Sequence, residues 1–123
     1  MNEVKITYKG QEYVLCTTLR TAYTIQNQFG HKPYLKVFNE LDNMVLEQQV
    51  RLLYIAFNLA NPDVCTEKEF FEDMLDSGSI IALNTTIAKL IEAISFNGLS
   101  EEEIAERKKA LQAQTQMSIT PTM

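Results

Sequence analysis

The sequence has little of the side-chain chemistry that catalysis uses. It holds one histidine, two cysteines and no tryptophan in 123 residues. One histidine provides little material for acid–base catalysis or for a metal cluster. His31 follows Gly30 at the predicted end of a helix, where an imidazole can hydrogen-bond the last carbonyl groups. We therefore interpret His31 as a solvated residue at the end of a helix. We predict no catalytic residue, no cofactor and no metal.

Glycine and long apolar runs are also scarce. The four glycines, at positions 10, 30, 78 and 98, separate predicted elements and form no phosphate-binding fingerprint. The longest apolar run, residues 50 to 60, is too short to cross a bilayer, so it predicts a core helix and no membrane span.

The two cysteines, Cys16 and Cys65, lie far apart in the sequence, and Met1 leads directly into charged residues that do not resemble a signal peptide. This pattern predicts a reduced, cytoplasmic protein. Cys65 precedes a predicted helix N-terminus, which can lower the pKa of a thiol. We therefore expect Cys65 to be the more reactive of the two cysteines. Without a neighbouring histidine or lysine it is not expected to be catalytic.

Positive charge is in short supply. The formal net charge is −5 and the sequence pI about 4.8, which argues against binding nucleic acid or an anionic membrane surface. The first 60 residues carry six basic and five acidic side chains, whereas residues 61 to 123 carry five basic and eleven acidic ones. A basic partner would be attracted to the second half.

Alternation of apolar and polar residues marks the N-terminal segment. Val4, Ile6 and Tyr8 alternate with polar residues before Gly10, and the alternation resumes after it. Gly10 supplies the positive φ of a tight turn. We predict a β-hairpin over residues 4 to 15, packed on a helix over residues 18 to 29.

Helical patterns fill most of the remaining chain. Thr17 or Thr18 can cap the first helix through its hydroxyl group, and Gly30 ends it. The apolar residues expected on one face of this helix are Leu19, Ala22, Tyr23 and Phe29. A short helix after Pro33 is expected to place Leu35, Phe38 and Leu41 on one side.

The central helix is predicted over residues 44 to 60, because this stretch is apolar on nearly every face. Leu53 and Phe57, one turn apart on it, are predicted core residues. Thr66 and Glu69 form a capping box that starts the next helix, which ends at Asp76-Ser77-Gly78. A further helix after it carries an apolar seam of Ile80, Leu83, Ile87, Leu90 and Ile94. Because this seam lasts only two heptads, it favours a helix of a bundle over a coiled coil.

The chain changes character after Gly98. Ser100 and Glu103 form a second capping box for a helix with a thin apolar stripe. We predict one domain over residues 1–98, a peripheral helix over 99–111 and a disordered, uncharged tail over 112–123. The fold class is α+β, mainly α: an N-terminal β-hairpin packed on a small bundle of about five helices.

The helix that follows Thr66 carries both acidic and apolar residues. Its carboxylates, at Glu67, Glu69, Glu72, Asp73 and Asp76, could imitate a metal site but lack a histidine, so a solvated face is favoured. Its apolar residues are Phe70, Phe71, Met74 and Leu75. They can all belong to the core, or they can form a patch that binds another protein; these four are the candidate protein-binding residues.

The order of these parts resembles a known family. The hairpin "VKITYKGQEYVL", the helix "TLRTAYTIQNQFG", the segment "QQVRLLYIAFNLANPD" and the segment "TEKEFFEDMLD" together resemble the tail assembly chaperones of long-tailed bacteriophages, especially those of Gram-positive hosts. The similarity covers roughly residues 4 to 97, and it rests on the order of the parts. Many relatives are acidic where this chain has Gln26-Asn27-Gln28.

The resemblance implies a non-catalytic protein in the host bacterial cytoplasm that is absent from the mature virion. Such chaperones bind the tape measure protein, keep it soluble and give way as tail tube protein polymerises around it. The tail tube protein and a second copy of the chain are further candidate partners. Some families make a longer form by ribosomal frameshifting, which would depart after Gln112. The alternative is a structural tail completion or connector protein retained in the virion, and a metal-dependent hydrolase is a distant third.

Overall fold

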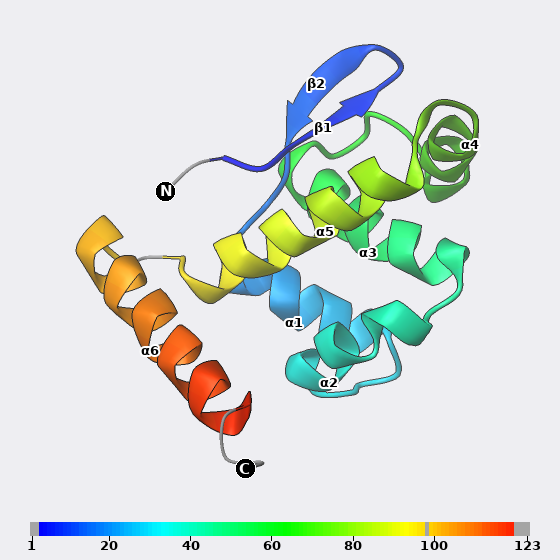
Figure 1. Cartoon of the computed structure of the whole chain (residues 1–123). Coiled ribbons are helices and arrows are strands. Elements are labelled where there is room, and N and C mark those ends of the chain that lie inside the picture. Colours follow the sequence, from blue (N-terminus) through cyan, green and yellow to red (C-terminus); the bar gives the residue numbers. More distant parts are fainter. Residues whose placement is uncertain (1–2, 98, 120–123) are drawn as a thin grey trace.

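The computed structural model describes residues 3–97 and 99–119, with the side chains of residues 3–97 and 99–110 (Figure 1). The elements in chain order are β1 (Lys5–Tyr8), β2 (Gln11–Val14), α1 (Leu19–Gln28), α2 (Tyr34–Asn39), the 3₁₀ helix η1 (Leu41–Asn43), α3 (Leu46–Ala60), α4 (Glu67–Ser77), α5 (Ile80–Ser95) and α6 (Glu101–Ile119). The predicted α+β class is confirmed, with a two-stranded hairpin on a mainly helical body. Among the described residues, no helix is both long and apolar enough to span a membrane.

The hairpin forms as its alternation predicts. β1 and β2 pair antiparallel, and the innermost pair is Tyr8 with Gln11. The two loop residues, Lys9 and Gly10, have φ angles of 49° and 79°, which is the left-handed geometry of a tight hairpin turn. Ile6 and Tyr8 point inward and are buried. The hairpin packs mainly on α3 and α4, and not on the helix over residues 18 to 29 as predicted.

Helix α3 lies at the centre of the fold. It packs against α1, α4, α5 and β2, and Figure 1 shows it enclosed by these elements. Leu53 and Phe57 are both 0% exposed, so their prediction as core residues is confirmed. A mainly apolar helix is stable here because its neighbours cover most of its surface.

Helix α1 turns a different face to the core than the sequence predicts. Leu19 and Tyr23 are 71% and 63% exposed, whereas Thr21, Ala22 and Ile25 are buried. Thr21 tolerates burial because its hydroxyl donates a hydrogen bond to the backbone oxygen of Cys16, at 2.8 Å. The prediction is therefore confirmed for Ala22 and for Phe29, which packs against the core, and is wrong for Leu19 and Tyr23.

Two local predictions at the helix ends also differ from the structure. Thr18 precedes α1, as expected, but its side chain makes no capping hydrogen bond; its hydroxyl lies 3.3 Å from the Cys16 sulfur. In α2, Leu35 is 59% exposed and Val37 is the buried residue. The one-sided arrangement predicted for Leu35 is wrong, because α2 turns Val37 toward α1.

Helix α5 largely follows its predicted seam. Leu83, Ile87, Leu90 and Ile94 are buried, but Ile80 is 65% exposed. The seam places Ile80 on the correct azimuth, yet the first turn of α5 extends past the elements that cover the later turns. Ile80 therefore belongs to the surface, and its placement in the seam is corrected.

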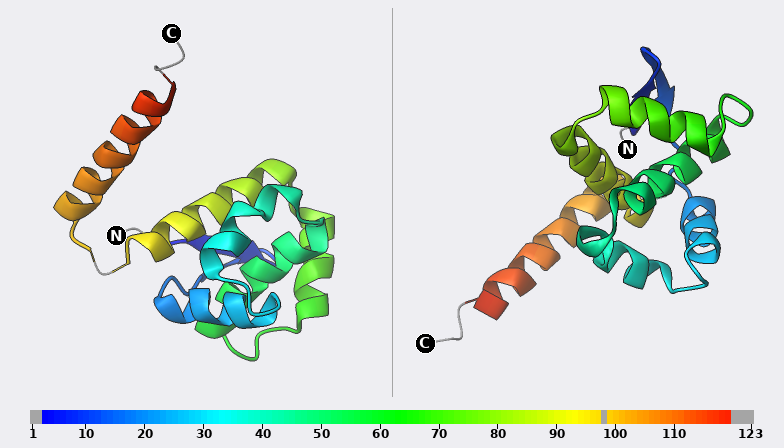
Figure 2. Two further views of the ribbon diagram at one scale, coloured as in Figure 1. Left: turned by 90° about the horizontal axis from the view of Figure 1, so that it is seen from below. Right: turned by 90° about the vertical axis from the view of Figure 1, so that its right-hand side faces the viewer.

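Helix α6 projects away from the other helices, as the two views in Figure 2 show. Both bonds of the predicted capping box are present, because the Glu103 N–H donates to Ser100 Oγ and Ser100 N–H donates to Glu103 Oε1. The helix extends to Ile119, past the predicted end at residue 111. The part of the predicted tail from residue 112 to Ile119 is therefore helical, and Gln, Ala and Met within it are good helix formers. Residues 98 and 120–123 lie outside the described residues.

Candidate functional site

The structure separates the four candidate protein-binding residues. Phe70 is 1% exposed and belongs to the core, so it is not available to a partner. Phe71 and Met74 are partly buried against that core. Leu75 is 47% exposed. The proposal of one patch of four residues is therefore wrong for Phe70, and Met74 and Leu75 take part in a different surface.

That surface is an apolar groove between the start of α3, the end of α4 and the start of α5. It has a volume of about 230 Å³ and is lined by Leu46, Val50, Met74, Leu75, Gly78, Ser79, Ile80 and Leu83. Val50 and Leu83 are buried and form its floor. Leu46, Leu75 and Ile80 form its rim, with exposed fractions of 38%, 47% and 65%. We call this set of residues the apolar groove.

The α4–α5 corner creates one end of the apolar groove. The Gly78 N–H donates a 2.8 Å hydrogen bond to the Met74 carbonyl and ends α4. A Cβ on Gly78 would lie 2.6 Å from that oxygen and 2.9 Å from the Met74 sulfur. Ser79 then caps α5 by accepting the Ala82 N–H at 3.1 Å. Only glycine permits this close approach, which sets Ile80 beside Leu75 in the lining.

Further apolar side chains are exposed next to the groove. Ile81 follows Ile80 and is 80% exposed, and Val45 precedes Leu46 and is 63% exposed. Adjacent apolar residues on a helix point about 100° apart, but this alone does not predict exposure, because Leu52 and Leu53 are adjacent on α3 and are both 0% exposed.

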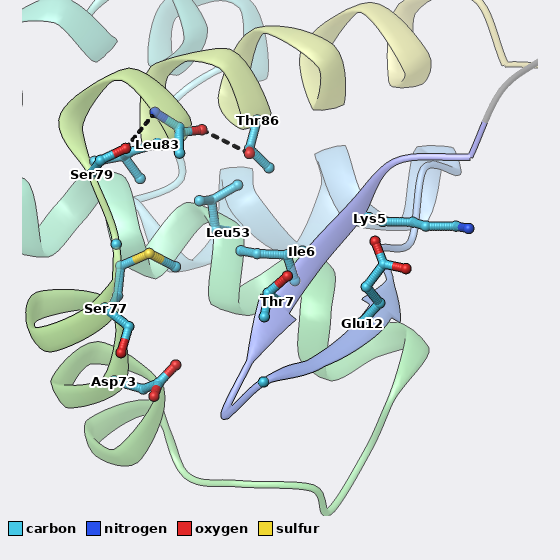
Figure 3. Close-up of a pocket in the computed structure, with 14 residues that line it drawn as sticks. Lys5, Ile6, Thr7, Glu12, Leu53, Asp73, Ser77, Ser79, Leu83 and Thr86 are labelled. Carbon is cyan, nitrogen blue, oxygen red and sulfur yellow. Dashed lines mark hydrogen bonds between the residues drawn. The ribbon is translucent and has the colours of Figure 1, made fainter.

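A second hollow, of about 350 Å³, lies on the other side of the same corner, between the hairpin and α4–α5 (Figure 3). Its lining is more polar, with Lys5, Glu12 and Asp73 among it. Two of its polar side chains have partners in the protein: Thr86 Oγ1 donates to the Ala82 oxygen at 2.8 Å, and Asp73 Oδ2 accepts the Lys9 N–H at 3.2 Å. Its lining contains no histidine or cysteine.

The pKa values of the two cysteine thiols are shifted in the opposite sense to the sequence prediction. Burial raises the pKa of the Cys16 thiol, but hydrogen bonds with Thr18 and Thr21 and the charge of Arg20 outweigh burial, so its pKa lies below the usual value. Burial raises the pKa of the Cys65 thiol above its usual value. Both thiols are free. These environments favour Cys16, and not Cys65 as predicted, as the more reactive thiol.

The remaining candidates for chemistry are not brought together. Over residues 3–97 and 99–110, no group of three or more histidine, cysteine or acidic side chains is placed to hold a metal ion. His31 is exposed with a φ angle of 58°, and among the hydrogen bonds described for these residues none comes from its imidazole. The helix-end hydrogen bond predicted for His31 is absent from that set.

Among the described residues, the apolar groove offers a partner contact with exposed apolar side chains from three helices. Comparisons of the chain with protein-family models, with curated proteins and with solved structures found no match.

Proposed function

We propose that this protein is a non-catalytic phage tail assembly chaperone that binds the tape measure protein and keeps it soluble while the tail tube is built. The observation that carries the proposal is the apolar groove with Ile80 and Ile81 exposed on one side of it, at 65% and 80%. The identity of the partner comes from the resemblance of residues 4 to 97 to that chaperone family.

The groove supports association because its exposed rim residues gain free energy when a partner removes them from water. Burial of apolar surface stabilises by about 25 cal/mol per Å² before the costs of association. Contiguous apolar patches on a monomer commonly mark protein-binding sites. Leu46, Leu75 and Ile80 come from three different helices, so the site is positioned by the folded core and is present before a partner arrives.

The position of the groove between three helices suits an amphipathic helix. A helix presents apolar side chains at i, i+3, i+4 and i+7, and such a stripe can seat in a groove between helices. The tape measure protein, as the resemblance implies, is long and largely helical, and would expose many such stripes before the tube encloses it. The chaperone covers these stripes in the host cytoplasm and leaves as tail tube protein takes its place.

The experiment that tests the proposal is co-expression of the chain with its phage's tape measure protein. The soluble fraction of the tape measure protein is measured with and without the chain, and the chain is then tested for co-purification. We expect more soluble tape measure protein in a complex with the chain. No gain in solubility and no complex would overturn the proposal. Finding the chain in purified virions would instead favour the structural tail protein.

A further inference from the structure

Acidic side chains flank the apolar groove on α3 and α4. Glu47 follows Leu46 at the start of α3, and Glu72 and Asp76 are close to Leu75 in α4; all three are exposed. We infer that the segment bound in the groove is an amphipathic helix whose apolar stripe is flanked by lysine or arginine. This inference rests on the proposed function and adds the charge of the segment that the chaperone selects.

The geometry of α4 places two of these acids on the solvent side of Leu75, just outside the apolar groove. At about 100° per residue, Glu72 and Asp76 lie roughly 60° and 100° from Leu75 around the helix axis, on the side opposite Met74. Met74 packs toward the core, so the acids lie on the solvent side of Leu75. A helix lying in the groove over Leu75 would therefore bring its flanking residues close to these carboxylates.

The end of α4 is unusually negative for a helix C-terminus. The last turn contains Asp76 and no basic residue. The helix dipole places partial negative charge at this end, where a cation is favoured and an acid is disfavoured. A lysine or arginine from a partner would meet the carboxylate and the helix dipole together, which makes this corner a favourable position for a cation.

The basic side chains of α3 and α4 form no described ion pair with the acids beside the apolar groove. Arg51 pairs with Glu67 at 3.2 Å, at the opposite end of α4. Lys68 lies one turn before Glu72, but the ion pairs described for residues 3–97 and 99–110 include none between them, and the first two turns of α5 carry no charged residue. The apolar groove lining itself holds no charged side chain. The lining of the apolar groove is therefore uncharged, and exposed acidic side chains lie just outside it on α3 and α4. The partner segment that complements this surface has an apolar stripe with basic residues on its flanks.

The same rim argues against a second copy of the chain as the occupant. A symmetric contact through the groove would bring the acids of one copy against those of the other, and like charges at an interface are unfavourable. The net charge of −5 adds to this repulsion.

The test uses two synthetic helical peptides that share one apolar stripe and differ only at the flanking positions, which are lysine in one and glutamate in the other. Binding to the full chain is measured by fluorescence anisotropy at low and at high salt. We expect the lysine peptide to bind roughly 3- to 10-fold more tightly at low salt, since exposed ion pairs contribute about 0.2–1 kcal/mol each. High salt should reduce this difference. Equal binding, tighter binding of the glutamate peptide, or no binding of either would overturn the inference.

A matched pair of variants locates the effect. Glu72→Gln with Asp76→Asn removes two charges from the rim, and Glu101→Gln with Glu102→Gln removes two exposed charges from α6. The rim variant should lose most of the preference for lysine, and the α6 variant should keep it. An equal loss in both would attribute the preference to net charge and overturn the assignment to the groove. Sedimentation of the chain alone tests whether a second copy occupies the groove, which would also overturn it.

The inference and the proposed function fail separately. If the tape measure protein is solubilised but the peptides show no charge preference, only the inference falls. If the preference is found but the tape measure protein is neither solubilised nor bound, only the proposed function falls.

Discussion

The rings of Phe57 on α3 and Phe70 on α4 lie with their centroids 5.0 Å apart and their planes tilted by 41°. Tyr8 of the hairpin packs on both, with centroid distances of 5.9 Å and 6.0 Å. Aromatic pairs at such distances stabilise beyond the area that they bury. This contact joins the hairpin, α3 and α4, and it explains why Phe70 belongs to the fold and not to a binding surface.

Truncating Phe70 is therefore predicted to unfold the protein more readily. Phe70→Ala should lower the free energy of unfolding by about 3–5 kcal/mol, whereas Leu75→Ala, at a 47% exposed position, should change it by less than about 1 kcal/mol. Urea denaturation of both variants measures this. If Phe70→Ala folds too poorly for titration, Phe70→Leu serves in its place, and equal stability of the Phe70 and Leu75 variants would contradict the assignment.

The α4–α5 corner is predicted to be intolerant of a side chain at Gly78. In Gly78→Ala, the new Cβ would lie 2.6 Å from the Met74 oxygen, so the backbone or Met74 must move. We expect a loss of about 1–3 kcal/mol in the free energy of unfolding. Ser77→Ala, at the neighbouring exposed position, is the control and should be nearly neutral. A neutral Gly78→Ala would show that the corner is looser than described.

Alkaline pH is predicted to destabilise the protein through Tyr8. Burial, with its hydrogen bond to the Cys65 thiol, raises the pKa of Tyr8 to about 12 from an ordinary value of 10.0. Because the folded pKa lies above the unfolded one, the stabilisation is full below pH 10 and is lost as the pH rises from about 10 to 12. Tyr8→Phe should show a smaller loss of stability than the wild type across that range. Identical pH profiles for the two proteins would disprove a role for this hydroxyl.

The two thiols are predicted to react at different rates. Because the pKa of Cys16 is lowered and that of Cys65 is raised, Cys16 has the larger thiolate fraction at neutral pH and should be alkylated first by iodoacetamide. Mass spectrometry of peptides from a time course measures both rates in one sample, and Cys16→Ser confirms the assignment. Faster labelling of Cys65 would contradict the described environments.

Local sequence signals predicted the features that depend on neighbours in the chain. The capping box of Thr66 and Glu69 is present, with the two reciprocal hydrogen bonds at 2.9 Å and 3.2 Å, because it needs only residues three positions apart. The hairpin turn at Gly10 follows equally local rules. The central position of Leu53 and Phe57 followed from an apolar pattern too broad for a surface helix.

Features set by tertiary contacts were not predictable in this way. Thr21 is accommodated in the core because its hydroxyl bonds the Cys16 backbone oxygen, and it lies on the buried face of α1 with Ala22 and Ile25. The apolar groove has the same origin, since Ile80 continues the buried seam of α5 but projects beyond the helices that cover it. Periodicity gives the azimuth of a residue on its helix, whereas its exposure depends on where the neighbouring elements end.

The most direct test of the proposed binding site compares two exposed apolar residues on different surfaces. Ile80 borders the groove and is 65% exposed, whereas Leu19 lies on α1 and is 71% exposed. Ile80→Asp and Leu19→Asp should both leave the fold intact, as checked by circular dichroism and melting temperature. Each variant is co-expressed with the tape measure protein, and the amount of complex recovered by affinity purification is compared with the wild type. We predict at least about a tenfold loss of complex for Ile80→Asp, since an interface anchor contributes about 2 kcal/mol or more, and wild-type recovery for Leu19→Asp. Undiminished binding by a folded Ile80→Asp, or its loss in Leu19→Asp instead, would contradict the assignment of the partner to the apolar groove.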